Sequence, residues 1–590
     1  MAYPLRFHSV HRVALVVLLS VTLVATIIST PAAAQAGPDC AEPFPLGDVT
    51  VGMTGAGSTV ERGTTPQPFS AEVLGVLKDG IAPGVDMIIA DLDSPTIDRV
   101  GVWAGMSGSP VYADDGRLLG AVSYGLSEGS SSIGGLTPAQ DMLDLYGDPG
   151  AAAGLKAAEE VALPAAVQRR AVTAADTTAA EARSGMAQLP LPLAISGLRP
   201  RRIDQLEQRI TRDRNVIPFA AGGAGATAAA SDTIFPGSNF GAAQSYGDLT
   251  AAGVGTTTDV CDGRVLAFGH PMLWAGSTRF SIHSADAIAV ESGVFGAYKL
   301  ANIGGVAGTV DQDRLAALRG RLGDGPQAIV ARADVRDPSR GYERTGRTWI
   351  NRSRDVADLA PLHVLANLDR GLDTIGDGRV GMTWTVRGTR GNGTPWKLTR
   401  TTRYADQSDV SFEATLDLFD WLFVLHDNRF AKLQFQGFTM QADVNENFQR
   451  LRLGTVRVAV NGGKFRRIGA IERLRVRAGD TIKVRAPLIR YQEQDPFRTV
   501  NLRLTVPQRL AGQSLRLGVF GGDSIQHERD IFGATSFDDL LTRMRRTEGS
   551  NDVIARLQRP GDAGPRVPSK AEHTVGNVVG GRRTVPVTIR

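Results

Sequence analysis

The chain has 590 residues, enough for about four domains, which excludes a lone binding module or a minimal enzyme. Hydrophobic residues make up 42% and charged residues 21%, as in globular proteins, so neither wholesale disorder nor a polytopic membrane protein is expected. The 65 basic and 61 acidic residues nearly balance and give no indication of a nucleic-acid partner. Glycine is in excess at 68 residues, and without a collagen-like period it predicts many tight turns in a β-rich fold.

Residues 1–36 have the features of a secretory signal peptide. A basic start precedes an almost unbroken apolar stretch, 13–29, and small residues surround Ala36. We expect cleavage after Ala36, with Ala34 as the alternative position; an uncleaved anchor is the other interpretation, because the apolar stretch only approaches spanning length. No later stretch is long and apolar enough to span a membrane. The sequence therefore predicts a secreted or cell-envelope protein with no transmembrane segment after signal cleavage.

Two cysteines, Cys40 and Cys261, follow the signal segment. An even number of cysteines in an oxidising compartment permits one disulfide, which would tie the mature N-terminus to a distant part of the chain. Two isolated cysteines do not make a metal site, and the sequence predicts no metal.

Short β-type runs separated by glycine occur between residues 49 and 124, and they predict a small barrel or sandwich at 37–150 that carries the serine motif described below. These runs are 71–77, 85–90, 111–112 and 118–124. Residues 151–188 are rich in alanine and have no sustained apolar period, which predicts a flexible or weakly helical linker. The linker contains Arg169 and Arg170, which suggest a site of autoprocessing.

A second β-rich region covers 189–335, and within it Asp262 and Gly263 predict a tight hairpin turn. The remaining chain is divided into a β-rich, sandwich-like α+β region, a short helical segment and a disordered tail: 336–530, 531–560 and 561–590.

Apolar residues at helical spacing predict two helices in the α+β region, at 356–372 and 412–426. A third helix begins after Ser536, whose hydroxyl would cap it. The tail is rich in glycine, proline and arginine and shows no core-forming pattern.

The strongest local signal is GMSGSP at 105–110, followed by two predicted strands. A nucleophilic serine on a tight turn needs small neighbours, and the glycines on either side of Ser107 supply them. The N–H groups of Gly105 and Ser107 would then form an oxyanion hole. Ser109 is expected to support the turn. A similar segment, GGDS at 521–524, is not predicted to be catalytic, because no glycine follows its serine. The alternative interpretation is an ordinary turn between two strands.

A serine nucleophile needs a general base. Of the eight histidines, His8 and His11 fall in the signal segment. Among the others His270 stands out, because it lies between Gly269 and Pro271 directly after a predicted strand. A structural turn is the alternative interpretation of this histidine, so the prediction depends on the serine and the histidine together.

Three segments together resemble the SpoIVB peptidase family, the serine endopeptidases named after stage IV sporulation protein B. They are VLGVL at 73–77, the serine motif at 105–110 with GAV at 120–122, and GRVLAFGHPM at 263–272. The resemblance covers 49–323. It implies a trypsin-like pair of six-stranded β-barrels with the site in the cleft between them, Ser107 as the nucleophile and His270 as the base.

Serine precedes histidine in this chain, so the two halves stand in permuted order relative to the sporulation peptidase. A catalytic triad tolerates such a change because the spatial roles of its members define it. No PDZ module is recognisable, and the large C-terminal region has no counterpart in that protein.

The family's acidic residue lies shortly before the serine motif in an Asp-Pro context, and the resemblance therefore points to Asp93. Other carboxylates stay open, because an orienting carboxylate only has to reach the imidazole Nδ1–H. These alternatives are Asp91, Asp98 and Asp286.

The sequence thus predicts an exported serine endopeptidase that cleaves a polypeptide substrate through an acyl-enzyme. Ser107 would attack, His270 would transfer the proton, and Asp93 would orient the imidazole. No cofactor is predicted. The alternative is a catalytically silent protein that keeps the peptidase fold as a scaffold or binds a protein partner in the cell envelope.

Overall fold

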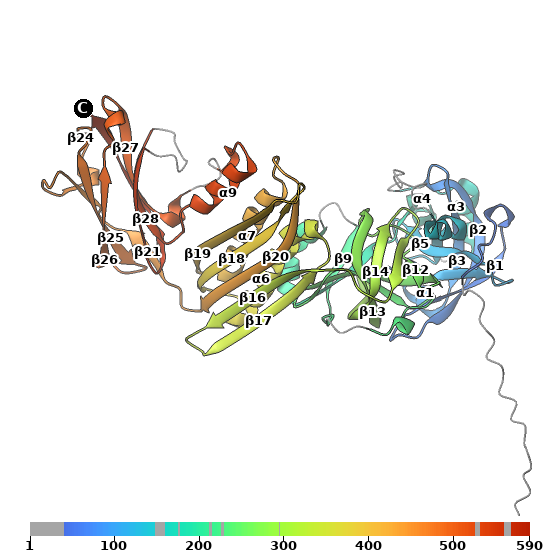
Figure 1. The fold of residues 1–590 in the computed structure, drawn as a ribbon. Helices are drawn as coiled ribbons and strands as arrows, with labels where there is room; N and C mark the ends of the chain where they lie inside the picture. Colours follow the sequence, from blue (N-terminus) through green and yellow to red (C-terminus); the bar gives the residue numbers. More distant parts are fainter. Residues whose placement is uncertain are drawn as a thin grey trace, which may run out of the picture. The chain divides into compact units, whose positions relative to one another are not determined.

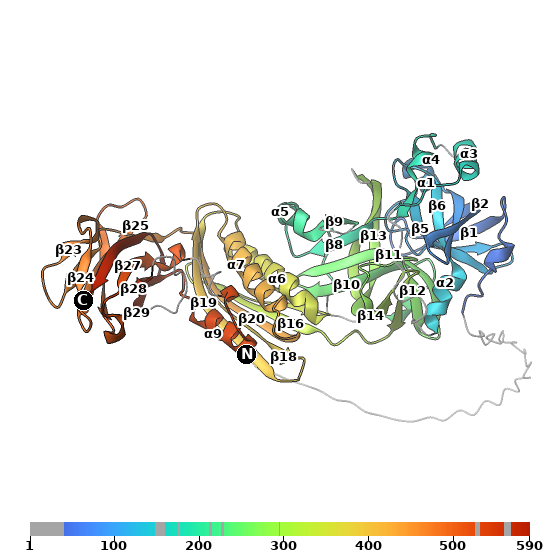
Figure 2. The same cartoon turned by 90° about the horizontal axis from the view of Figure 1, so that it is seen from above.

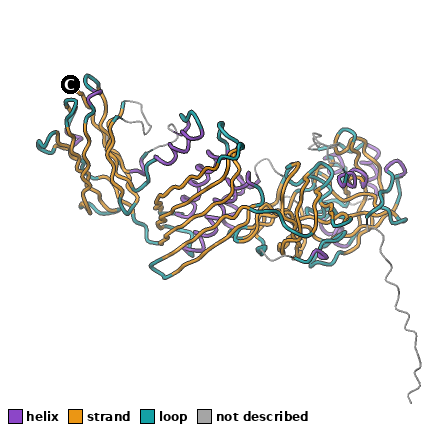
Figure 3. The backbone as a smooth tube through the Cα atoms, viewed as in Figure 1, coloured by secondary structure: helices purple, strands orange, loops and turns teal. Residues whose placement is uncertain are grey.

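The structure is a computed structural model that describes residues 40–147, 160–174, 177–211, 215–225, 229–293, 296–525, 531–559 and 568–590. The predicted signal segment, 1–36, lies outside these residues. The described chain is mainly β, as predicted, and strands predominate over helices throughout the trace (Figure 3). None of the helices in this part of the chain is long and apolar enough to cross a membrane.

Six of the described N-terminal strands close into a β-barrel, drawn in blue in Figure 1. The pairing order is β4-β1-β2-β3-β6-β5, and β5 pairs back with β4 to close the ring. The strands are β1 (Thr54–Thr59), β2 (Gln67–Ala82), β3 (Val85–Asp93), β4 (Pro110–Ala113), β5 (Leu118–Leu126) and β6 (Ile133–Pro138), with helices α1 (Pro95–Val100) and α2 (Ala139–Leu143). All four predicted β runs lie on these strands, because their alternate apolar residues face the barrel core, among them Val73, Ile88 and Val122.

The described part of the predicted linker is packed on the first barrel. It forms α3 (Ala165–Ala174), α4 (Glu181–Ser184) and β7 (Met186–Gln188), and β7 pairs with β5. Val167 and Ala171 are buried against this barrel, and Arg170 donates a hydrogen bond to the Leu74 carbonyl. Of the two predicted alternatives, the helical one therefore describes these residues, and the flexible one does not. Alanine is too small to give a clear apolar period, yet it fits a shallow surface closely.

A second ring of six paired strands follows, in green in Figure 1. Its order is β10-β13-β14-β15-β12-β11, and β11 pairs back with β10. The strands are β10 (Asn239–Gly247), β11 (Thr250–Cys261), β12 (Arg264–Ala267), β13 (Gly276–Gly293), β14 (Gly296–Asp313) and β15 (Leu318–Leu322); β8 (Leu191–Ser196), β9 (Val216–Ala220) and α5 (Pro200–Thr211) precede them. The predicted hairpin turn is present between β11 and β12, where Asp262 and Gly263 both have positive φ.

The sheet of the second ring continues into an α+β layer through the pairing of β17 with β10. Its elements are β16 (Ile329–Asp337), β17 (Tyr342–Ile350), α6 (Val356–Leu372), β18 (Gly378–Arg390), β19 (Pro395–Asp406), α7 (Val410–His426), β20 (Leu433–Asn445) and α9 (Phe537–Arg546). Helices α6 and α7 lie side by side on the sheet (Figure 2).

The predicted helices of this layer are present. Helix α6 has the predicted bounds, α7 begins two residues earlier than expected, and the Ser536 hydroxyl caps α9 by accepting from the Asp539 N–H. The predicted boundary between 335 and 336 is wrong, because it falls inside β16. This strand pairs with β17 on one side and β20 on the other, so no break exists there.

Two further sheets share one apolar core at the C-terminal end. They consist of β21 (Arg450–Leu453), β22 (Arg457–Val460), β23 (Arg466–Arg467), β25 (Thr481–Arg490), β26 (Pro496–Thr505) and β30 (Val578–Gly580) in one sheet, and β24 (Leu474–Val476), β27 (Ser514–Gly521), β28 (Asp552–Gln558), β29 (Ser569–Thr574) and β31 (Arg582–Ile589) in the other. The prediction of a disordered tail is wrong for 568–590. Val579, Val585 and Val587 enter the core, and their alternation is hidden among glycine and arginine.

Cys40 and Cys261, the two cysteines singled out in the sequence, are joined by a disulfide. Cys40 lies just before Phe44, whose N–H donates to the Leu118 carbonyl of the first barrel. Cys261 ends β11 of the second ring. The bond therefore crosslinks the two rings across a sequence separation of 221 residues.

Candidate active site

Ser107 lies on the loop that leads into β4 of the first barrel, and its side chain is buried. Both glycines beside it have positive φ, +101° at Gly105 and +96° at Gly108. A Cβ at Gly108 would lie only 2.1 Å from the Thr256 carbonyl oxygen. Glycine is therefore required here both by backbone conformation and by the close approach of the second ring.

His270 lies on the loop after β12 of the second ring. The chain turns through positive φ at both Phe268 and Gly269, which brings the histidine back toward the first barrel. The Thr137 hydroxyl of that barrel donates to the Gly269 carbonyl over 2.6 Å. Each ring thus supplies one reactive side chain and also holds the loop that carries the other.

The structure brings Ser107 and His270 together, with Oγ and Nε2 separated by 2.8 Å. On the other side of the ring, Nδ1 lies 2.9 Å from the carbonyl oxygen of Pro271. A carbonyl oxygen only accepts, so Nδ1 carries the proton and Nε2 accepts from the Ser107 hydroxyl. Burial lowers the pKa of His270 to about 4, against the opposing effect of the Pro271 hydrogen bond, so the imidazole is neutral at pH 7 and able to take a proton.

The peptide units around Ser107 fix the direction of the Gly105 and Ser107 N–H groups. In a planar trans peptide the C=O and N–H point in opposite directions. The Met106 carbonyl, which shares a peptide with the Ser107 N–H, accepts from the N–H and the hydroxyl of Ser109. The Ala104 carbonyl, which shares a peptide with the Gly105 N–H, accepts from a backbone N–H of the second ring.

Both N–H groups therefore point away from these contacts, and neither donates a hydrogen bond within the described part of the chain. An oxyanion hole requires free N–H donors beside the nucleophile, and these two N–H groups meet that requirement. Ser109 has the supporting position expected for it, since its hydroxyl is bound to the backbone and not to the histidine.

The structure does not bring Asp93 to His270. Asp93 is exposed at the end of β3, and the Ser70 hydroxyl contacts its carboxylate over 3.4 Å. The imidazole Nδ1 that a triad carboxylate would bind is already paired with the Pro271 carbonyl. The other candidates form no described hydrogen bond with His270 either: Asp91, Asp98 and Asp286. Asp93 ends β3 and lies opposite Ser70 on the neighbouring strand β2, so its closeness in sequence to the serine motif does not give it a contact with the histidine.

A different carboxylate, Asp313, holds the histidine loop in place. It is buried at the end of β14 and accepts from three backbone N–H groups that follow His270, those of Met272, Leu273 and Ala275, over 2.8–2.9 Å. Burial raises the pKa of Asp313, and these N–H groups oppose that effect. No motif surrounds Asp313 in the sequence, so nothing there identified it.

Strand β11 of the second ring holds the serine loop by donating hydrogen bonds to the backbone carbonyl groups of that loop. The Thr256 N–H donates to the Ser107 carbonyl and the Thr256 hydroxyl to that of Gly105, over 2.8 and 3.0 Å. The Thr258 hydroxyl donates to the Gly108 carbonyl over 2.8 Å. Both threonines belong to the TTT run at 256–258, which in the sequence indicates only a strand. The sequence alone therefore did not identify them as part of the site.

The described conformation is closed over the serine and histidine. Ser107 is 2% exposed and His270 is fully buried. The end of the linker covers the histidine loop, since the Gln188 side-chain amide donates to the Pro271 carbonyl over 3.2 Å, and Pro192 lies beside Gly105. A peptide bond can reach Ser107 only when the atoms that cover it move.

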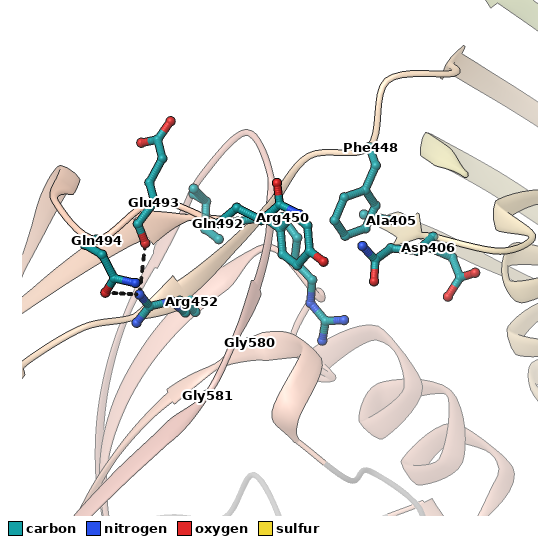
Figure 4. A pocket seen from close by; sticks show the side chains of 13 residues that line it. Ala405, Asp406, Phe448, Arg450, Arg452, Gln492, Glu493, Gln494, Gly580 and Gly581 are labelled. Atoms are coloured by element: carbon teal, nitrogen blue, oxygen red, sulfur yellow. Dashed lines mark hydrogen bonds between the residues drawn. The ribbon is translucent and has the colours of Figure 1, made fainter. Parts of the chain in front are cut away.

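Two pockets lie elsewhere in the molecule. One, of about 540 Å³, is lined by Phe448, Arg450 and Tyr491 between the α+β layer and the C-terminal sheets (Figure 4). The Phe448 and Tyr491 rings meet edge to face there. The other, of about 700 Å³, includes Asn351 and Arg352. Ser107 and His270 line neither pocket.

No protein-family model, curated protein or solved structure matches this chain. The interpretation of the site therefore depends on its geometry. That geometry consists of a hydroxyl bound to a neutral imidazole, with two unpaired N–H groups beside the hydroxyl.

Proposed function

We propose that the protein is an exported serine endopeptidase of the SpoIVB type that hydrolyses polypeptide. The observation that carries this proposal is the 2.8 Å contact between Ser107 Oγ and the unprotonated Nε2 of His270. The two N–H groups beside the hydroxyl support it, because they form no hydrogen bond within the described residues and are free to donate to a tetrahedral intermediate.

In the proposed reaction each of these groups has a defined role. Ser107 Oγ attacks the scissile carbonyl carbon while His270 Nε2 takes the hydroxyl proton, and the Gly105 and Ser107 N–H groups bind the oxyanion. Nε2–H then protonates the leaving amine as the C–N bond breaks, which leaves an ester on Ser107. Water attacks this ester with Nε2 as the base, and the returning proton restores the serine.

This mechanism uses a serine and a histidine with a backbone carbonyl as the orienting group. The Pro271 carbonyl keeps the proton on Nδ1, which is the tautomer that a triad carboxylate would select. It stabilises the imidazolium less than a carboxylate does, because it carries no full charge. The two six-stranded rings, with serine on the first and histidine on the second, support a trypsin-like arrangement in permuted order.

A second candidate function is a silent scaffold of the cell envelope, and the burial of the pair favours it. Ser107 and His270 are covered, and the described pockets lie elsewhere. In a scaffold the serine and histidine contact would serve only to join the two rings.

A fluorophosphonate probe separates the two functions. We expect wild type to be labelled and Ser107→Ala and His270→Gln to remain unlabelled. Ser524→Ala is the matched control, because this serine also follows glycine but lies in a short 3-10 helix directly after β27 at the C-terminal end, and labelling should persist in it. Labelling of Ser107→Ala, or none in wild type from pH 5 to 9, would refute the peptidase proposal. Hydrolysis of a proteome by wild type and not by Ser107→Ala would then show the substrates.

A further inference from the structure

Lys299 is a buried lysine that the proposed reaction does not use. Its side chain is fully buried on β14, and Nζ donates to Asn239 Oδ1 over 3.0 Å and to Thr256 Oγ1 over 3.4 Å. Among the described residues no carboxylate forms a salt bridge with it. Burial of an ammonium group without a paired charge costs several kcal/mol. Such a position is expected only where the charge or its hydrogen bonds have a task.

The backbone and side chain of Lys299 both hold the glycine of the proposed oxyanion hole. The Lys299 N–H donates to the Ala104 carbonyl over 2.8 Å, and this peptide carries the Gly105 N–H at its other end. A Cβ placed on Gly105 would lie 2.7 Å from Lys299 Cβ and 3.6 Å from Cε. The lysine side chain therefore runs directly along Gly105.

A relay of hydrogen bonds joins the ammonium group to the same glycine. The single hydroxyl proton of Thr256 goes to the Gly105 carbonyl, so the Thr256 oxygen must accept from Lys299. The second acceptor is fixed as well. The Asn239 amide nitrogen donates to the carbonyls of Gly63 and Ala285, which turns its oxygen toward Lys299.

We propose that Lys299 is a positioning residue for the oxyanion hole, holding the Gly105 peptide through Ala104 and Thr256 while its positive charge stabilises the oxyanion that forms there. This inference rests on the proposed peptidase function. Lys299 does not touch the substrate, since it lies behind the loop. A fixed positive charge in a water-excluded site acts strongly on a negative charge that develops nearby.

The groups that face Lys299 give this charge a defined pH range. Asn239 on β10 and Thr256 on β11 are uncharged, and so is the serine loop around Gly105. Within the described residues Glu61 is the charged group whose field acts on Lys299, and its carboxylate also accepts from the Thr96 hydroxyl. Burial lowers the pKa of Lys299 to about 7, partly opposed by Glu61. Activity should then rise as His270 loses its proton above pH 4 and fall as Lys299 loses its own near pH 7.

The test is the pH profile of kcat in wild type, Lys299→Met and the control Lys78→Met, whose lysine is on the surface of the first barrel. In wild type and Lys78→Met, kcat should rise above pH 4 and fall again near pH 7; these are the rising and falling limbs of the profile. In Lys299→Met kcat should fall by about 10- to 100-fold at pH 6 with KM unchanged, and the limb near pH 7 should disappear. A purely structural lysine would not move this limb.

Thr256→Val and Thr256→Ser provide a second test that does not depend on folding of the lysine variant. Valine removes the relay hydroxyl at nearly constant volume, and serine keeps it. We expect kcat to be lower in Thr256→Val and close to that of wild type in Thr256→Ser. Two results would overturn this inference and leave the peptidase proposal standing. One is an active wild type together with a Lys299→Met variant that keeps the fall near pH 7, and the other is equal activity of the two Thr256 variants. A wild type that never reacts with the fluorophosphonate would overturn the peptidase proposal and this inference with it.

Discussion

The Pro271 carbonyl oxygen lies 2.9 Å from Nδ1 of His270, the residue that precedes it. This contact occupies the place where a serine-protease triad has a carboxylate. It fixes the tautomer of the imidazole without adding a buried negative charge. Among the residues that the structure describes, no carboxylate forms a hydrogen bond with His270, and burial is the main influence that lowers its pKa.

Asp93→Asn should change kcat/KM by no more than about twofold, because Asp93 is exposed and bound to Ser70. In an enzyme that uses Asp93 as the triad carboxylate, the same change would cost about 10⁴-fold. Peptide hydrolysis measured on purified wild type and variant decides between the two. A loss of a thousandfold would return Asp93 to the mechanism.

Asp313→Asn should destabilise the protein by about 2–3 kcal/mol. The change replaces one carboxylate oxygen, which accepts backbone N–H groups, with an NH2 group that cannot accept a hydrogen bond. Activity should fall as well, since the loop after His270 loses its anchor. Asp311→Asn is a matched control two residues away on the same strand; its half-exposed carboxylate pairs with Arg319, and its loss should cost under about 1 kcal/mol. Denaturant unfolding measures both, and equal losses in the two variants would contradict the assignment.

The disulfide should stabilise the folded protein substantially, because its 221-residue separation restricts the unfolded chain strongly. In the chain-entropy model a loop of this length is worth about 5 kcal/mol. The double variant Cys40→Ser/Cys261→Ser should therefore have a free energy of unfolding lower by about 5 kcal/mol, measured by denaturant unfolding. Thiol titration of the unfolded wild type gives an independent check, and two free thiols before reduction would show that the bond does not form.

Stability should decrease between pH 6.5 and 4. Burial lowers the pKa of His270, His283 and His363 to about 4 in the folded protein, from 6.5 in the unfolded chain. Between these values the unfolded chain binds more protons, so the stability present above pH 6.5 is lost as the pH falls toward 4. Each histidine contributes about 3 kcal/mol to this loss.

His363→Gln isolates one part of the acid effect, since His363 contacts Thr348 away from the serine. Its unfolding free energy should depend less steeply on pH than that of wild type over the same range. Denaturant unfolding at several pH values provides the measurement. A wild type whose stability is constant from pH 6.5 to 4 would contradict the prediction.

Much of the fold could be predicted from short-range patterns. The strands of the first barrel, helix α6 and the capped start of α9 follow from apolar periodicity and one hydroxyl, and these depend on neighbouring residues only. The tail and the linker could not be predicted in the same way. Their small or interrupted apolar residues become buried only because distant strands provide a matching surface.

The sequence by itself determined which serine and which histidine to consider, because a reactive side chain on a tight turn requires glycine beside it and leaves a local motif. Only the tertiary structure decided what surrounds them. Asp313 under the histidine loop, and Thr256 and Lys299 behind Gly105, have no motif of their own. Pro271 belongs to the histidine motif, but nothing in that motif indicates that its carbonyl takes the place expected for Asp93. Thr256 and Lys299 act through hydrogen bonds between the two rings, to residues more than 100 positions away. Asp313 reaches the histidine loop from the end of β14, 38 to 41 positions along the chain. These contacts are set by how the strands pair and close, whereas the Pro271 contact depends on the local turn at His270.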